Sequence, residues 1–214
     1  MNKLKIHFIL EGAEEEMLFE IVKQKGLGES FELTYRNANG GGNIPAYYQN
    51  DIQTEKYDIV YCVYDVDYSA DDKDSMYQKV RSGLKKVLGS DSMIDKISLC
   101  TNPNIMLIVL LGCDDVEALS GISKSKSSNT GLINKYFDKI GNKKDYDASS
   151  WQLEIIKSDY LYDKYKYEEI VKKYGLLNEN YKDDTIGSNI LRILKALFEN
   201  DICFFKKIQE SIDI

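Results

Sequence analysis

The sequence predicts an α/β protein with a doubly wound, mostly parallel sheet and a helical C-terminal extension. Short apolar runs alternate with amphipathic segments of helical spacing, which is typical of parallel sheets with right-handed crossovers. Residues 57–64 are apolar almost throughout, as expected of a central strand covered on both faces. The end of the chain, residues 188–212, has an apolar stripe at helical spacing.

The elements of the first half follow from these patterns. Strands are predicted at residues 5–10, 31–35, 57–64 and 96–100, and helices at residues 14–25, from Pro45 onward, and at residues 75–88. Glutamates open the first helix, where the helix dipole favours negative charge, and proline is favoured in a first turn. Residues 37–43 contain three consecutive glycines and are predicted to be a loop.

The second half is predicted to be mainly helical. The apolar residues 105–111 suit a helix or a strand, with helix favoured, and residues 120–144 suit exposed loops around a short helix. Helices are predicted at residues 160–174 and 188–212, the latter with an apolar face of Leu191, Leu194, Leu197, Phe198, Ile202 and Phe205. We expect an α/β core over residues 1–119, with a mainly helical C-terminal region over residues 120–214 packed on it.

The composition is that of a globular protein, with 43% hydrophobic and 29% charged residues in a chain of 214. The net charge of −7 argues against coating of nucleic acid, but a bound divalent cation reverses the local field, so a nuclease stays possible. No stretch approaches the roughly 20 apolar residues of a spanning helix, and no signal-peptide core is present. We expect a soluble, cytoplasmic protein.

The cysteines do not predict a zinc site. Cys62, Cys100, Cys113 and Cys203 lie in apolar runs without a CxxC pair, and His7 is the only histidine. The usual Cys/His ligand spacing of zinc is therefore missing. Each cysteine is expected to be a buried, reduced thiol.

Three carboxylates stand where predicted strands end. Glu11 follows the first strand, and Asp65 and Asp67 follow the third. Carboxyl ends of parallel strands converge on one crevice, and in an extended segment Asp65 and Asp67 would project to the same side. Carboxylates are preferred ligands of Mg²⁺ and Mn²⁺, and a crowded set needs a cation to offset its repulsion. The alternative is that these acids are turn formers and helix caps.

The first two motifs resemble the Toprim domain, and within it the RloB-like proteins, a bacterial family associated with defence and restriction loci. The first family motif reads roughly Glu-Gly-x-x-Thr-Glu-x-x-Tyr-Phe. This chain matches at Glu11, Gly12 and Glu16, with Glu15 at the threonine and residues 18–19 at the aromatic pair. The second motif, Asp-x-Asp, is present at residues 65–67.

The third motif departs from the family pattern. The family has Ser-Asn-Pro, then Phe-Glu, then an apolar helix with tryptophan and histidine, whereas this chain has Thr-Asn-Pro at residues 101–103. Met106, Ile108 and Gly112 stand at the places of the glutamate, tryptophan and histidine. The residues expected to bind the metal are therefore kept. The glutamate and histidine of the third motif are missing, and with them any catalytic step that they would perform.

The resemblance covers about residues 4–112 and implies a Toprim-type fold and phosphodiester hydrolysis or transfer on DNA or RNA. Glu11 would be the general acid/base or a metal ligand, and Asp65 and Asp67 would hold Mg²⁺ or Mn²⁺. Glu16 is an accessory acid or a structural residue, and Asn102 is a possible accessory residue. An ATPase or another defence-system protein is the partner that the family implies.

Two other classes use similar residues. A haloacid-dehalogenase-type phosphatase would use Asp65 and Asp67 with Thr101 and a later acidic pair at residues 114–115. The roughly ten residues before that pair are too few for a crossover. A receiver domain would need an acidic pair after the first strand, an aspartate after the third and a lysine after the fifth. This chain offers Glu11 and Asp65 but no clearly placed lysine. A catalytically degenerate module that binds a protein or a nucleic acid is the stronger rival, because the third motif is incomplete.

Three further segments have a structural and a functional interpretation. Residues 40–42 could cradle a phosphate, but they lack the P-loop's Gly-Lys-Ser/Thr, and a flexible loop is favoured. Tyrosines and lysines interleave over residues 157–174, which suits either stacking on single-stranded bases or, preferably, a packed helix. Asp71, Asp72 and Asp74 are interpreted as a solvated loop.

Overall fold

The computed structural model describes residues 3–24, 30–54, 56–67, 72–102, 105 and 187–212. The predicted elements at residues 120–144 and 160–174 lie outside the described residues, as do Cys113, Asp71 and all of the segment 105–111 except Ile105. The predicted boundary at residue 119 lies outside them as well.

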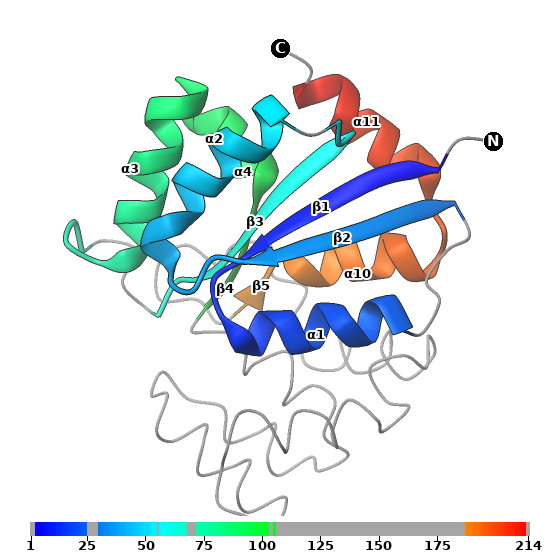
Figure 1. The fold of residues 1–214 in the computed structure, drawn as a ribbon, viewed down its shortest axis with the longest axis horizontal. Coiled ribbons are helices and arrows are strands. Elements are labelled where there is room, and N and C mark those ends of the chain that lie inside the picture. Colours follow the sequence, from blue (N-terminus) through cyan, green and yellow to red (C-terminus); the bar gives the residue numbers. More distant parts are fainter. Residues whose placement is uncertain are drawn as a thin grey trace, which may run out of the picture.

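The sheet has the order β2-β1-β3-β4-β5 (Figure 1). Its strands are β1 (Leu4–Leu10), β2 (Phe31–Asn37), β3 (Ile59–Asp65), β4 (Ser98–Asn102) and β5 (Gly187–Ser188). The first four are mutually parallel, and β5 runs antiparallel to β4. The predicted α/β class with a doubly wound, mostly parallel sheet is confirmed.

Helices cover both faces of the sheet (Figure 1). One face carries α1 (Ala13–Gln24) and α10 (Ile190–Phe198), and the other carries α2 (Ile44–Thr54), α3 (Met76–Leu88) and α4 (Asp91–Ile97). A final helix, α11 (Ile202–Ile212), lies near the end of the sheet where the strands begin. Within the described part of the chain, no helix is long and apolar enough to span a membrane.

The central strands are apolar because both of their faces are covered. On β1, Phe8 points to the α1 face and contacts Phe19, whereas Ile9 belongs to the core beneath α2 and α3. The five residues of β1 before Glu11 are all buried, and so are the six residues of β3 before Asp65. Strands buried on both sides lose the polar alternation of a half-exposed strand.

The predicted strand at residues 96–100 is corrected to 98–102, because Lys96 and Ile97 belong to α4. This short helix was missed. Gly89 ends α3 in the left-handed conformation at φ 72°, and Ser90 precedes α4. A glycine C-cap followed by a serine at the N-cap is a sequence signal that separates two helices.

The predicted helix at residues 188–212 is corrected to β5, α10 and α11. Asn200 has a positive φ of 53°, and Asp201 accepts a hydrogen bond from the Phe204 N–H at 2.9 Å, so the chain turns and a new helix begins. On the predicted apolar face, Leu194, Leu197 and Phe205 are buried. The apolar stripe in the sequence does not reveal this break, because both helices bury an apolar face against the rest of the protein.

The cysteine prediction is confirmed at Cys62 and Cys100, which are buried, and is wrong at Cys203, which is exposed. Burial raises the pKa of the Cys62 thiol well above its usual range. Cys203 lies in the first turn of the amphipathic helix α11 and on its outer side.

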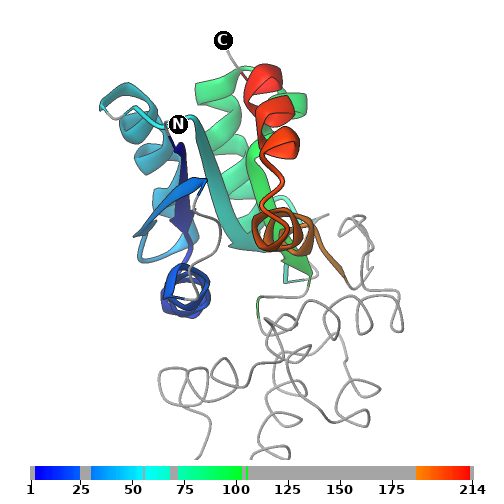
Figure 2. The same ribbon diagram turned by 90° about the vertical axis from the view of Figure 1, so that its right-hand side faces the viewer.

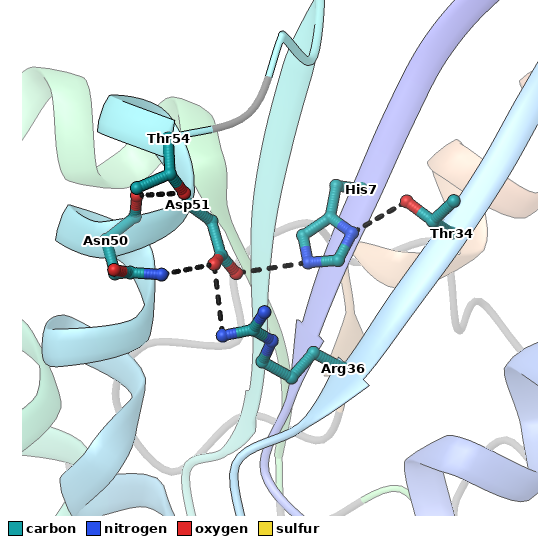
Figure 3. Close-up of polar contacts among 6 residues, drawn as sticks. All are labelled: His7, Thr34, Arg36, Asn50, Asp51 and Thr54. Atoms are coloured by element: carbon teal, nitrogen blue, oxygen red, sulfur yellow. Dashed lines mark hydrogen bonds and ion pairs between the residues drawn. The ribbon is translucent and has the colours of Figure 1, made fainter.

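A polar network that the sequence did not reveal fastens α2 to the sheet (Figure 3). His7 on β1 contacts the Thr34 hydroxyl through Nδ1 at 2.7 Å and the Asp51 carboxylate through Nε2 at 3.3 Å. Arg36 on β2 reaches the same carboxylate at 3.1 Å. Because Asp51 is fully buried, these contacts offset the cost of removing its charge from water.

Asp51→Ala is expected to lower the free energy of unfolding by about 1–3 kcal/mol, since it removes the carboxylate that faces the buried imidazole of His7 and the Arg36 guanidinium. Arg36 is 39% exposed and regains water, which limits the loss. Urea unfolding followed by circular dichroism measures it. Gln53→Ala, at an exposed position of the same helix, is the matched control and should stay within about 0.5 kcal/mol of the parent.

The helices α2 and α3 approach closely at a glycine. A Cβ on Gly83 would lie 2.5 Å from Cγ and 2.8 Å from Cβ of Pro45. The proline ring is rigid, so the two helices would have to separate to admit a methyl group. Glycine is therefore required here for packing and not for backbone conformation.

Gly83→Ala is expected to lower the free energy of unfolding by about 1–3 kcal/mol through this overlap. The sign is opposite to the gain of about 1 kcal/mol that alanine gives over glycine in an unobstructed helix. Thermal or urea unfolding measures the change. Ser82→Ala, at the exposed neighbouring position, should be neutral or slightly stabilising, and a stabilised Gly83→Ala would contradict the close packing.

Candidate functional site

The acidic site lies where β1 and β3 end side by side. The chain leaves β1 toward β2 on one side and leaves β3 toward β4 on the other, so this is the topological switch point of the sheet, where ligands bind in open α/β proteins. The Glu11 N–H donates to the Val63 carbonyl at 3.0 Å. The Glu11 carboxylate accepts the backbone N–H of Asp65 at 2.9 Å through Oε2. Two of the predicted residues are thus neighbours.

Asp65 is the most perturbed acid of the site. Its Oδ1 accepts the backbone N–H of Ile105 at 2.9 Å. Burial raises the pKa of the Asp65 carboxyl well above its usual range, and the negative charges of Glu15, Glu11 and Asp67 raise it further. Several acids therefore act on this one carboxyl group, and a strongly perturbed carboxyl in such surroundings is a candidate functional residue.

The expected conformation of Asp67 is corrected. The strand ends at Asp65, and Asp67 lies in a turn with a left-handed φ of 52°, not in an extended segment. Val66 is buried, and its N–H donates to the Thr101 carbonyl at 3.0 Å. Asp67 itself is exposed, so its link to the site rests on its electrostatic effect on Asp65.

Glu15 is a site residue that sequence reasoning missed. It is only 3% exposed, and its Oε2 accepts the Gly12 N–H at 2.9 Å. Burial raises the pKa of Glu15 to about 7, with Glu11 and Glu14 adding to the shift. A glutamate three residues after a helix N-cap commonly folds back onto the cap's N–H, and this spacing was the signal that could have found it.

The two accessory residues lie on α1 and at the end of β4. Glu16 accepts a hydrogen bond from the Asn37 side-chain amide at 2.7 Å, which ties α1 to β2 and supports the structural interpretation. Asn102 is fully buried at the end of β4, opposite Gly187 of β5. Asp72 and Asp74 are exposed, as predicted for the acidic loop.

The glycine segment forms one wall of the site. Residues Gly41–Asn43 form a 3₁₀ turn, η1, which corrects the predicted loop. The Gly40 N–H donates to the Glu11 carbonyl at 2.7 Å, and Gly40 has a φ of 117°. A Cβ on Gly41 would lie 3.2 Å from Glu11 Oε1 and 2.8 Å from Cγ of Met76. Gly41 therefore allows the chain to pass close to the Glu11 carboxylate.

The predicted metal site is only partly assembled. No three Asp, Glu, His or Cys side chains in the described ranges come together as a ligand set would. The acids nevertheless fit a hard cation chemically, because Mg²⁺ usually takes only one or two carboxylates and keeps water as its other ligands. A cation would also offset the mutual repulsion that raises the pKa of Asp65.

Comparison of the chain with protein-family models, with curated proteins and with solved structures found no match. The Toprim and RloB-like resemblance therefore rests on the motif residues themselves.

Burial of Glu15 predicts that the stability of the protein depends on pH when a chelator keeps divalent cations from the site. Its pKa is 4.5 in an unfolded chain and about 7 in the fold, so the unfolded state ionises first as the pH rises. Its contribution to stability is therefore fully present below pH 4.5 and is lost between pH 4.5 and 7. Glu15→Gln does not ionise and removes this loss. The free energy of unfolding of the variant minus that of the parent should therefore increase by roughly 3 kcal/mol between pH 4.5 and 7.

Urea unfolding at a series of pH values measures this difference. Glu32→Gln, at an exposed position of β2, corrects for the general effect of removing one negative charge. A difference between Glu15→Gln and the parent that stays constant with pH would contradict the burial of an ionisable Glu15.

Proposed function

We propose that the chain hydrolyses or transfers phosphodiester bonds of nucleic acid with the help of a divalent cation, at the Glu11 and Asp65 site. The observation that carries the proposal is the hydrogen bond between the Glu11 carboxylate and the Asp65 N–H, across 54 positions of sequence. It joins the ends of two central strands at the switch point, where a crevice with acidic groups suits a cation and a phosphate.

Each acidic residue has a distinct role in the proposal. Asp65 and Asp67 would hold Mg²⁺ or Mn²⁺, and Glu11 would act as general acid/base or as a further ligand. The bound cation would stabilise negative charge on the phosphate and activate a water molecule. Glu15, with a pKa of about 7 in the absence of a cation, can take up and release a proton near neutral pH.

The resemblance to Toprim and RloB-like proteins supports the same roles for Glu11, Asp65 and Asp67. It also supports a cytoplasmic setting in bacterial defence or restriction, with DNA or RNA as substrate and an ATPase or another defence-system protein as partner. In this setting the net charge of −7 limits non-specific adhesion to nucleic acid, and the cation supplies the local positive charge.

A degenerate Toprim-like module that binds a protein or a nucleic acid without cleaving it is the second candidate. The exposed, left-handed Asp67 favours it, since this residue does not face Asp65 from an extended strand. So does Gly112, which stands where the family has a histidine. In this candidate the hydrogen bond of Glu11 to the Asp65 N–H would serve to join β1 and β3.

Metal dependence separates the two candidates. We expect Mn²⁺ or Mg²⁺ to raise the melting temperature and to support cleavage of labelled single-stranded or double-stranded DNA or RNA. Asp65→Asn should lower the cleavage rate by at least about 10²-fold, because it removes a proposed ligand of the cation that stabilises negative charge on the reacting phosphate. The melting temperature and the cleavage rate are measured on the full chain.

Asp72→Asn and Asp74→Asn are the matched controls, since both positions are exposed and acidic and outside the proposed site. They should leave cleavage and the metal effect unchanged. Should added metal leave the melting temperature unaltered while Asp65→Asn behaves like the parent on every substrate, the binding module is the function that remains.

A further inference from the structure

A pocket beside β4 shares no lining residue with the Glu11 and Asp65 site. It has a volume of about 360 Å³ and is formed by α4, the start of β4, α10 and α11. In Figure 2, α11 lies above α10, beside the β4 flank of the sheet. Asn189, the N-cap of α10, fixes this wall, because its side-chain amide bonds the Cys100 N–H and the Ser98 carbonyl at 2.7 and 2.8 Å.

Positive charge is concentrated in the pocket. Lys96, Arg192 and Lys207 line it, with Asp95 as the only acid among its lining residues. The Asp95 carboxylate forms an ion pair with Arg81 at 2.8 Å, so its charge is already balanced from outside the pocket. In a chain with a net charge of −7, this local excess of cations favours an anionic ligand.

The uncharged lining combines the polar side chains of Asn189 and Ser211 with apolar and aromatic side chains. Leu99 and Ile193 are buried and form part of the wall. The Arg192 guanidinium lies over the Phe204 ring, 4.9 Å from its centroid. Aromatic rings and guanidinium planes are the surfaces on which flat heterocycles stack, so the pocket offers a place for a ring as well as for a charge.

We propose that this pocket binds a nucleoside monophosphate, or a terminal nucleotide of the same chemistry. The phosphate lies among Lys96, Arg192 and Lys207, and the base packs on the Arg192 and Phe204 planes. The volume falls within the range of about 300–1,000 Å³ that is usual for small-molecule sites. The site contains no residue of the acidic cluster and does not depend on the function proposed for it.

Lys207 is the residue on which the test rests. It lies on the exposed side of α11 and lines the pocket, whereas its neighbour Lys206 is also exposed but does not line it. The Lys96 ammonium donates to the Ser211 carbonyl at 2.7 Å, which holds the C-terminal part of α11 against α4. Replacing Lys207 therefore changes the charge of the pocket without removing this contact.

Binding of AMP, adenosine and inorganic phosphate to the full chain is measured by isothermal titration calorimetry in the presence of EDTA. The chelator prevents a cation-mediated complex at the acidic site, so the outcome is independent of the proposed nuclease activity. We expect saturable binding of AMP and at least tenfold weaker binding of adenosine. Lys207→Gln should weaken AMP binding by about tenfold through loss of one charge-assisted contact.

Lys206→Gln is the matched control and should bind AMP within twofold of the parent. Phe204→Leu should weaken AMP binding while leaving phosphate binding unchanged, with circular dichroism confirming that the variant is folded. The proposal is overturned if AMP shows no saturable binding, if adenosine binds as tightly as AMP, or if the two lysine variants lose affinity equally.

Discussion

The pairing of β1 with β3 is the constraint on which the acidic site depends. In this register Leu10 lies opposite Val63, so Glu11, the next residue, comes within hydrogen-bonding distance of the Asp65 N–H through its side chain. The two strands are held by apolar residues on both faces, and their connections then diverge to opposite sides of the sheet. The Glu11 carboxylate joins the ends of the two strands by accepting the Asp65 N–H. A shift of one residue in this register would separate the two acids.

Two carboxylates, the buried Asp51 and the partly buried Asp65, illustrate how differently the fold treats negative charge. Asp51 is surrounded by His7 and Arg36, so its charge is balanced within the core and contributes to the attachment of α2. Asp65 is influenced chiefly by other acids and by burial, which raise its pKa. Balanced charge is what stability alone would select, whereas crowded like charge costs stability and is typical of functional sites.

The acidic site and the cationic pocket are formed by different residues and have opposite local charge. The strand ends with Glu11 and Asp65 suit a cation, and the pocket with Lys96 and Lys207 suits an anion. The short strand β5 and the amide of Asn189 complete the edge of β4, and this edge supports the wall of the pocket.

The sequence by itself determined the α/β class, the four parallel strands and the placement of Glu11 and Asp65 at strand ends, because apolar period and strand length are local properties of the chain. It did not determine the turn at Asp67, the break at Asn200 or the short helix α4, where backbone conformation depends on packing. Tertiary structure alone decided that Glu15 acts on Asp65 and that His7 meets Asp51. These contacts join residues whose separation along the chain says nothing about their distance in space, since they depend on how the helices pack on the sheet.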